Sequence, residues 1–426
     1  MNKLIWPSRS RSIYLWISCV VIVLCPTAHA QQFALRNGDT VVFYGDSITA
    51  QRLYTRYVED FVFTRYPNLH IRFLNAGVPG DSITGGYAGS MPERVQRDVQ
   101  PFHPAMIAVM LGMNDGGWGQ ESPQIDASFS KGYRELLDTL HKAATDAALT
   151  LIRPSPYDEI THGTEFPQYS RVIDDLANDV SAIATTERKH NPDKLFLADF
   201  HQALIDALKQ ATVHSPDLAA LIIPDRIHPS EVGHWIMAAE LLKAWHVDPI
   251  VSSATLDAKH ATIIDRYRTA ITQLTSTANI IQWQELDEAL PLPFDFNDAM
   301  ILLLPRISDI AAVDRQMLRI ESLDPGQYQL FIDGKPIASF NSRELQSGIN
   351  LALYKTPMND QARDIEYTQH QRMQLDQARF ILSADIKEDA ASMAAENKLR
   401  EAQDQLSQQI QKKRTPAPHK FELRRQ

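Results

Sequence analysis

Short apolar runs alternate with longer segments of helical periodicity over the first 250 residues. The apolar runs occupy positions 41–44, 71–75, 106–111, 149–152 and 195–198. Apolar residues recur at helical spacing in 54–66, 129–148, 170–186 and 231–245, the last segment being preceded by Ser230 as an expected N-cap. This alternation predicts βαβ crossovers, so we expect an α/β fold in three α/β/α layers around a five-stranded, mostly parallel sheet.

The pattern changes beyond residue 250. Residues 254–276 suggest a helix, and 290–297 form an irregular, proline-rich segment. Between 327 and 340 two alternating runs flank an Asp-Gly pair, which is a strong β-hairpin signal. The proline-free segment 359–412 predicts one or two long polar helices, solvated or packed on a neighbour, and the residues from 415 onward resemble a frayed tail. We therefore expect three parts: 1–30, 31–250 and a C-terminal extension, 251–426.

The first thirty residues have the pattern of a secretory signal peptide. Three cations precede an apolar run at 13–24, and an Ala-His-Ala segment at 28–30 supplies small residues for cleavage after Ala30. The run is short for a bilayer span of about 20 residues, which favours cleavage over a membrane anchor. The expected protein is secreted or periplasmic, with no stable membrane insertion after cleavage.

Composition narrows the possible chemistry. Both cysteines, Cys19 and Cys25, lie in the leader, so residues 31–426 contain no thiol for a disulfide, a zinc site or a nucleophile. Loss of the leader's three cations takes the formal net charge from −10 to about −13, which disfavours nucleic acid as a partner. Histidines are scattered, and no metal-binding motif or glycine-rich phosphate loop is present, so we expect no metal and no cofactor.

Four short motifs follow strands or precede the last predicted α/β helix. They are Gly-Asp-Ser at 45–47, Asn-Ala-Gly at 75–77, Gly-Met-Asn-Asp at 112–115 and Asp-Arg-Ile-His-Pro at 225–229. In open α/β sheets, catalytic groups gather beyond the carboxyl ends of the strands, where these motifs are expected. A serine hydroxyl there becomes a nucleophile only if a base and oxyanion donors converge on it.

Together, the four motifs resemble the blocks of the SGNH (GDSL-type) hydrolase family, over roughly residues 38–248. The resemblance implies a flavodoxin-like SGNH hydrolase fold and a serine esterase. It implies Ser47 as the nucleophile, His228 as the general base and Asp225 as the residue that orients His228. The Ser47 and Gly77 N–H groups and the Asn114 amide would then form the oxyanion hole.

The pentapeptide Gly-Asp-Ser-Ile-Thr occurs a second time at 80–84. This copy follows Val-Pro instead of a strand, so we place the nucleophile at Ser47. Asp81 and Ser82 are instead possible substrate-pocket residues. Trp118 is another, although a role in covering the core is equally compatible with the sequence.

Two other polar residues have structural interpretations. Asp46 in the strand-to-helix turn is more often a cap than an active-site group, and we favour the cap. His234, in the last predicted α/β helix, is expected to be structural.

The expected function is an exported serine esterase that hydrolyses short-chain acyl esters, preferably O-acetyl groups on a carbohydrate. The alternative among enzymes is a broad-specificity lipid or aryl esterase or lysophospholipase. A polysaccharide-binding or scaffold protein with an inherited SGNH fold is the alternative from another class. The C-terminal helices are candidates for homo-oligomer contacts.

Overall fold

A five-stranded, all-parallel sheet organises residues 33–250 in the computed structural model. Its strand order is β2-β1-β5-β6-β7, with β1 (Thr40–Gly45), β2 (Arg72–Gly77), β5 (Met106–Met110), β6 (Ala148–Arg153) and β7 (Leu195–Asp199). The predicted strands and the α/β class are confirmed. The structure describes residues 32–426 apart from 120, 164 and 386–389, so the predicted signal peptide lies outside the described residues.

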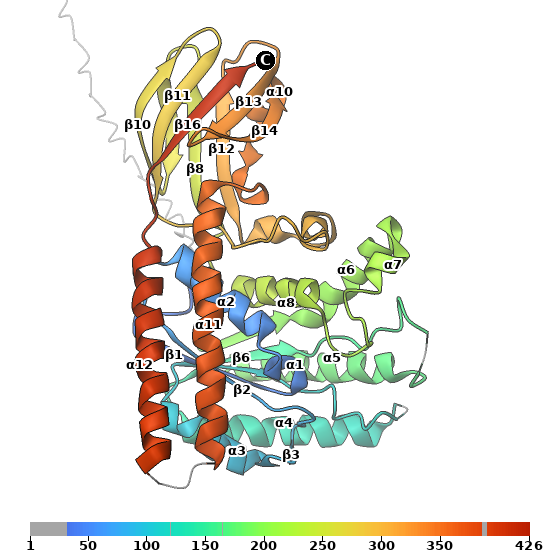
Figure 1. Cartoon of the computed structure of the whole chain (residues 1–426). Helices are drawn as coiled ribbons and strands as arrows, with labels where there is room; N and C mark the ends of the chain where they lie inside the picture. Colours follow the sequence, from blue (N-terminus) through green and yellow to red (C-terminus); the bar gives the residue numbers. More distant parts are fainter. Residues whose placement is uncertain (1–31, 120, 164, 386–389) are drawn as a thin grey trace, which may run out of the picture. The chain divides into compact units, whose positions relative to one another are not determined.

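Helices cover both faces of this sheet (Figure 1). One face carries α2 (Leu53–Arg65), α6 (Phe200–His214) and α8 (Glu231–Ala244), and the other carries α3 (Met91–Asp98), α4 (Pro123–Ala143) and α5 (Tyr169–Arg188). Short α1 (Ser47–Ala50) follows β1, and α7 (Pro216–Ala219) follows α6. Ser230 does occupy the N-cap position of α8, but its side chain makes no capping hydrogen bond.

The prediction of a helix at 254–276 is wrong. The segment forms three strands instead, β8 (Ile250–Asp257), β9 (Thr262–Tyr267) and β10 (Thr269–Ser276). Residues 252, 254 and 256 of β8 are buried while 253, 255 and 257 are only partly buried, which is a two-residue period. The turn after β8 is closed by Asp257, whose side chain accepts the Lys259 and His260 N–H groups.

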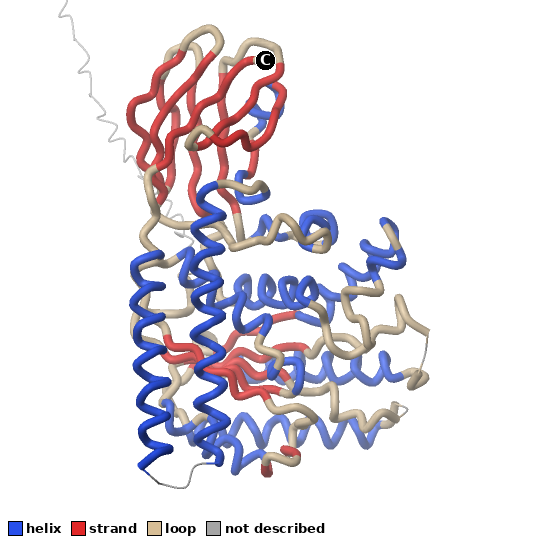
Figure 2. Tube along the Cα trace, viewed as in Figure 1, coloured by secondary structure: helices blue, strands red, loops and turns tan. Residues whose placement is uncertain are grey.

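Two further sheets build an all-β body from the C-terminal extension (Figure 2). One has the order β10-β11-β16-β13-β14 and the other β15-β12-β8-β9. The additional strands are β11 (Ile280–Asp287), β12 (Arg315–Glu321), β13 (Gln327–Ile332), β14 (Lys335–Asn341), β15 (Ile349–Asn350) and β16 (His419–Arg425). The predicted hairpin is confirmed: Asp333 and Gly334 join β13 to β14, both with positive φ (51° and 76°).

The prediction of a frayed tail from residue 415 is also wrong. Residues 419–425 form β16, which pairs with both β11 and β13. Phe421 and Leu423 are buried, and the Phe421 ring stacks on Trp283 at 5.0 Å between centroids. Within β16 these two apolar residues alternate with charged residues, which is a strand pattern. The segment is mostly polar overall, so its composition alone suggests a tail.

The two long polar helices are confirmed as α11 (Pro357–Asp385) and α12 (Ala390–Lys413), which pack on each other. Helix α11 also packs on α2, where Arg372 pairs with Glu59 at 2.7 Å. Residues 33–426 cluster as one compact unit, so the domain boundary near residue 250 stays a prediction. Among the described helices, none combines the length and apolarity needed to cross a membrane.

Candidate active site

Ser47 stands at the first position of α1, directly after β1. The Asp46 side chain accepts the Ile48 N–H at 2.9 Å and so caps this short helix, as predicted. Gly45 is required at the end of β1, since a side chain there would collide with Thr49 and with the Met110 carbonyl. The local chain therefore holds the Ser47 side chain at the carboxyl edge of the sheet.

The structure joins Ser47 to the motif at 225–229, far along the chain. The Ser47 Oγ lies 2.9 Å from Nε2 of His228, and Nδ1 of the same ring lies 2.7 Å from Oδ2 of Asp225. Oδ1 of Asp225 accepts the N–H groups of Ile227 and His228, at 3.0 and 2.6 Å. The result is a hydrogen-bonded Ser-His-Asp series of the kind used in acyl transfer.

Partial burial by itself would raise the pKa of Asp225. Hydrogen bonds from the His228 N–H, the His228 ring and the Ile227 N–H outweigh that effect and lower the pKa below the ordinary value for an aspartate. Asp225 is therefore ionised at neutral pH. Its charge favours the imidazolium form of His228 that proton transfer from Ser47 would create.

Asn114 follows β5, the neighbour of β1 in the sheet. Its side-chain amide donates one hydrogen bond to the Asp81 carbonyl at 2.9 Å. An amide has two N–H donors, so this bond fixes the side chain and leaves the second donor for a ligand. The position agrees with the predicted oxyanion role.

Gly77 does not support its predicted role. Its N–H donates to Oδ1 of Asn75 at 3.0 Å, so the donor is already used at the end of β2. A side chain at Gly77 would collide with the Ala50 backbone, and close packing of α1 on β2 explains the glycine. Gly80, three residues farther along the same loop, has φ +72°, and its N–H makes no hydrogen bond to any residue that the structure describes, so this donor is available.

The second Gly-Asp-Ser-Ile-Thr copy forms a structural loop. Asp81, a possible substrate-pocket residue by the sequence, is fully buried and pairs with Arg94. The Ser82 hydroxyl donates to the Gly85 carbonyl at 2.8 Å within the same turn. Trp118 stacks on Tyr169, with ring centroids 4.9 Å apart, and so covers an aromatic cluster at the start of α5. Each of these three side chains is thus engaged in a structural contact.

Arg94 is the buried centre of this loop, and sequence reasoning did not identify it. Its guanidinium donates to the Asp81 carboxylate, to the Ala76 carbonyl of β2 and to Asp98, and it lies 4.4 Å from the centre of the Tyr44 ring. The Asp81 that it holds also supplies the carbonyl that fixes the Asn114 amide. Arg94 thus connects the core to a predicted oxyanion donor.

Two buried carboxyls lie in the loops around this site. Burial raises the pKa of Asp46 to about 7, against the hydrogen bond from the Ile48 N–H. Burial likewise raises the pKa of Asp115 to about 7, although its Oδ1 accepts the Ile83 N–H at 2.8 Å. Both carboxyls therefore keep their protons to a higher pH than an ordinary aspartate does.

His234 has the structural role that was predicted. It is fully buried in α8, where Nδ1 accepts the Tyr54 N–H at 3.1 Å and Nε2 lies 2.8 Å from the Gln51 side chain. Burial lowers its pKa to about 3, so the ring is neutral and joins the start of α2 to α8. Within the described part of the chain, no group of three or more His, Cys, Asp or Glu side chains is arranged to hold a metal ion.

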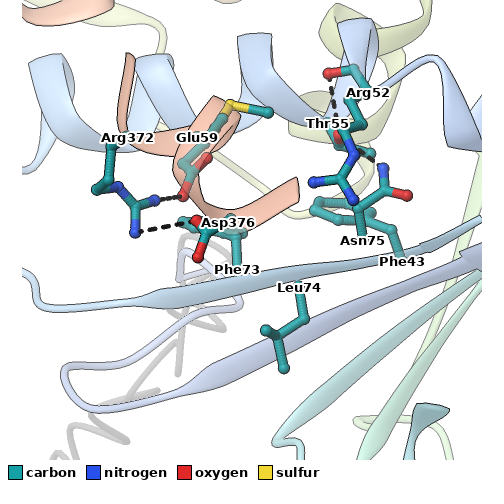
Figure 3. Close-up of a pocket in the computed structure, with 10 residues that line it drawn as sticks. Phe43, Arg52, Thr55, Glu59, Phe73, Leu74, Asn75, Arg372 and Asp376 are labelled. Carbon is teal, nitrogen blue, oxygen red and sulfur yellow. Dashed lines mark hydrogen bonds and ion pairs between the residues drawn. The ribbon is translucent and has the colours of Figure 1, made fainter. Parts of the chain in front are cut away.

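Helix α11 closes a small cavity of about 120 Å³ against α2 and the edge of the sheet (Figure 3). Arg372 of α11 reaches toward Glu59 of α2 and Asp376, while Arg52 and Asn75 line the opposite side. A larger pocket, of about 280 Å³, lies against the same two helices. The C-terminal extension therefore contributes side chains to a cavity against α2, the helix that follows α1 along the chain.

Known proteins resemble the α/β part of this chain. Residues 43–236 match the GDSL-like Lipase/Acylhydrolase family. An acetylxylan esterase of Geobacillus stearothermophilus is 27% identical over 229 residues, which cover 49% of this chain and 94% of that enzyme. A crystal structure of Axe2, an acetylxylan esterase from the same organism, covers 50% of this chain and 97% of its own at 22% identity, with a TM-score of 0.39.

One solved structure resembles almost the whole chain. It is described as BT4096, a gut microbial diltiazem-metabolizing enzyme, and it is 22% identical. The match covers 93% of this chain and 99% of the other, with a TM-score of 0.73, so the fold of the C-terminal extension recurs together with the α/β part. By these matches, residues 43–236 form an SGNH, or GDSL-like, hydrolase domain, and the protein is a carboxylic ester hydrolase.

Proposed function

We propose that this hydrolase removes short acyl groups, above all O-acetyl groups, from a carbohydrate through an acyl-enzyme on Ser47. The observation that carries the proposal is the hydrogen-bonded series from Ser47 through His228 to Asp225. The acetylxylan esterase similarity supports an acetylated sugar as the substrate. The free second donor of Asn114 supports stabilisation of a tetrahedral intermediate.

The proposed reaction has two steps. In the first, His228 Nε2 takes the Ser47 proton while Oγ attacks the ester carbonyl carbon, and the negative charge on the carbonyl oxygen is met by the Asn114 amide and the Gly80 and Ser47 N–H groups. Collapse breaks the bond to the alcohol oxygen, which receives the proton from His228. In the second step water attacks the acyl-enzyme with His228 as base, releasing the carboxylic acid and restoring Ser47.

Export to the periplasm or the medium is part of the proposal, supported by the leader pattern at 1–30. An exported esterase would meet polysaccharide outside the cytoplasm. Cell fractionation of the full chain, with mass spectrometry of its amino terminus, tests both the location and cleavage after Ala30.

The central experiment measures acetate release from acetylated xylan, acetylated mannan and p-nitrophenyl acetate. Ser47→Ala should lose nearly all turnover, because the proposed mechanism has no other nucleophile. Ser82→Ala is the matched control from the repeated pentapeptide, and it should keep most turnover, since the Ser82 hydroxyl bonds within its own loop. Equal acetate release by wild type and Ser47→Ala would refute the mechanism, and loss of turnover in Ser82→Ala alone would move the nucleophile.

A further inference from the structure

Arg226 lies between Asp225 and the proposed general base, His228, and its backbone is strained. It has φ 71°, in the left-handed region where a Cβ is sterically unfavourable. Such a conformation persists only where surrounding contacts hold it, and it is often found at functional sites. The contacts of Arg226 therefore show what holds the segment 225–228 in its catalytic arrangement.

The backbone of Arg226 is hydrogen-bonded on both sides. Its N–H donates to the Ile223 carbonyl at 3.1 Å, and its carbonyl accepts the Asp158 N–H at 2.9 Å. Asp158 belongs to the β6 loop, the segment between β6 and α5, whose described residues are 154–163 and 165–168. The turn that brings Asp225 next to His228 is thus bonded to a neighbouring loop at the carboxyl edge of the sheet.

The side chain of Arg226 makes a second attachment to the β6 loop. Its Nε donates to the Gly163 carbonyl at 2.8 Å, and its Nη1 lies 3.2 Å from Oε2 of Glu165. The Glu165 side chain is exposed, so this ion pair contributes little by itself. The charge-assisted hydrogen bond to a backbone carbonyl is the stronger contact and fixes the direction of the guanidinium.

His162 of the β6 loop makes a third attachment. Its Nε2 lies 2.9 Å from the Ile223 carbonyl oxygen and 3.2 Å from that of Ala220, so Nε2 carries a proton that it donates to these carbonyls. The β6 loop is itself held by the buried Asp158 carboxylate, whose Oδ1 accepts two N–H groups of the loop at 2.8 and 3.0 Å. The segment before His228 is therefore fastened to an ordered part of the loop.

The β6 loop also reaches the segment that carries Asn114. It leads into α5, whose first residue, Tyr169, donates its hydroxyl proton to the Met113 carbonyl at 2.7 Å. Tyr157 of the β6 loop packs edge to face on the Tyr169 ring, with centroids 5.4 Å apart. One loop thus connects the segment of the proposed base to that of a proposed oxyanion donor.

We propose that Arg226 is a positioning residue for His228, and that its attachment to the β6 loop sets the geometry in which Nε2 of His228 faces Ser47. The inference rests on the proposed function, because it concerns the base that takes the Ser47 proton. In this role Arg226 changes the rate of the chemical step and not the affinity for the ester.

Arg226→Met tests the side-chain attachment, because it removes the donors and keeps a long side chain at the strained position. On p-nitrophenyl acetate we expect kcat to fall about 100-fold with KM within about twofold of wild type, as for a catalytic group displaced by about 1 Å. Arg226→Lys, which keeps the charge and can donate to one of the two acceptors, should keep kcat within about tenfold of wild type. Arg134→Met is the matched control: this exposed arginine bonds the Ser130 carbonyl within α4, and its loss should leave both constants unchanged.

His162→Ala tests the third attachment in the same assay. It should lower kcat with little change in KM, and His162→Gln should restore part of the loss, because its amide can donate to the same carbonyls. Since Arg226 and His162 hold one segment, the effects of Arg226→Met and His162→Ala on kcat should combine to less than their product. Fully multiplicative effects would overturn a shared attachment.

Proton nuclear magnetic resonance of the Ser47→Ala protein separates this inference from the proposed function, because it reads the His228 geometry without turnover. The Nδ1 proton of His228, held at 2.7 Å by Asp225, should give a low-field signal that His228→Ala abolishes. Adding Arg226→Met should shift or remove the signal, and adding Arg134→Met should retain it.

An unchanged signal with Arg226→Met would overturn the inference, whether or not the wild type hydrolyses any ester. So would a rise in KM at wild-type kcat, which would place Arg226 in substrate binding. A lower melting temperature with wild-type kcat would overturn it as well, since Arg226 would then serve stability alone.

Discussion

Asp46 is the residue before the candidate nucleophile, yet its side chain is buried, with only 1% of the residue exposed. Burial raises its pKa to about 7, whereas an unfolded chain releases this proton near the ordinary value of 3.8. Between these values the folded state binds more protons than the unfolded state, so the Asp46 contribution to stability falls as pH rises from about 4 to 7.

Asp46→Asn should abolish this fall in the free energy of unfolding with pH, because asparagine does not ionise. It should keep the helix cap, because an asparagine oxygen can still accept the Ile48 N–H. At pH 8 the variant should gain up to about 4 kcal/mol in free energy of unfolding over wild type, since one pKa unit is worth about 1.4 kcal/mol. At pH 4 the two proteins should be close. Urea denaturation at both pH values measures the difference, and a constant difference across the range would contradict the titration.

Asn114→Ala tests the oxyanion donor separately from the nucleophile. We expect kcat to fall about 100- to 1000-fold with KM little changed, because the amide would act on charge that develops in the transition state. Steady-state kinetics on p-nitrophenyl acetate provide the measurement. Asn191→Ala, at an exposed asparagine, is the control. A fall of less than about tenfold for Asn114→Ala would exclude a leading role for its amide.

The sequence could identify Ser47, Asp225 and His228 because each lies in a short motif with a clear position relative to a strand or helix. It could not separate Gly77 from Gly80, since both are glycines close together at the end of β2. The difference lies in the Asn75 side chain, which takes the Gly77 N–H. That allocation of hydrogen bonds depends on tertiary packing and has no sequence signature.

At the level of elements, helix α3 holds the loop after β2 in place through Arg94, which bonds Asp81 of that loop and the Ala76 carbonyl of β2. Arg94→Gln would leave the buried Asp81 carboxylate without its ion-pair partner, which typically costs about 3–5 kcal/mol. We also expect kcat to fall, because the Asp81 carbonyl positions the Asn114 amide.

Adding Asp81→Asn to Arg94→Gln removes the orphaned charge and provides the control. The double variant should recover part of the lost stability, measured by urea denaturation, so the two substitutions should not be additive. Strict additivity in both stability and kcat would show that Arg94 does not act through Asp81.

The parallel sheet was predictable because each of its strands is a short apolar run between helical segments. The strands at 250–276 were not predictable in this way, because their exposed positions carry threonine and isoleucine as well as charged residues. β9, for example, is exposed along its whole length, so no buried face marks it in the sequence. Such edge strands are determined by pairing with a neighbour, here β8, more than by their own pattern.

At the scale of the whole molecule, Arg414 connects the end of α12 to the end of α2. Its guanidinium donates to the carbonyl oxygens of Phe63, Tyr66 and Leu69 and lies 4.9 Å from the centre of the Phe63 ring. Burial lowers the pKa of Arg414 to about 10, which leaves it charged at neutral pH. A residue from the C-terminal extension thus supplies donors to carbonyl groups at and beyond the end of α2.

Arg414→Met should lower the free energy of unfolding by about 3 kcal/mol, because hydrogen bonds from a charged group are lost and carbonyl groups are left buried. Arg400→Met, at an exposed arginine of α12, should change stability by less than about 0.5 kcal/mol. Thermal and urea denaturation of the two variants give the comparison. Similar stability for both would mean that the extension is not needed to stabilise the end of α2.

The place of β16 between β11 and β13 has a consequence for the order in which the chain can fold. A ribosome makes β10, β11, β13 and β14 well before residues 419–425, so these strands emerge as two separate pairs with their inner edges unpaired. The five-stranded sheet closes only after β16 has been synthesised. If the chain is exported as we propose, this delay keeps the all-β body unfinished during synthesis, when an unfolded chain is easiest to move across a membrane.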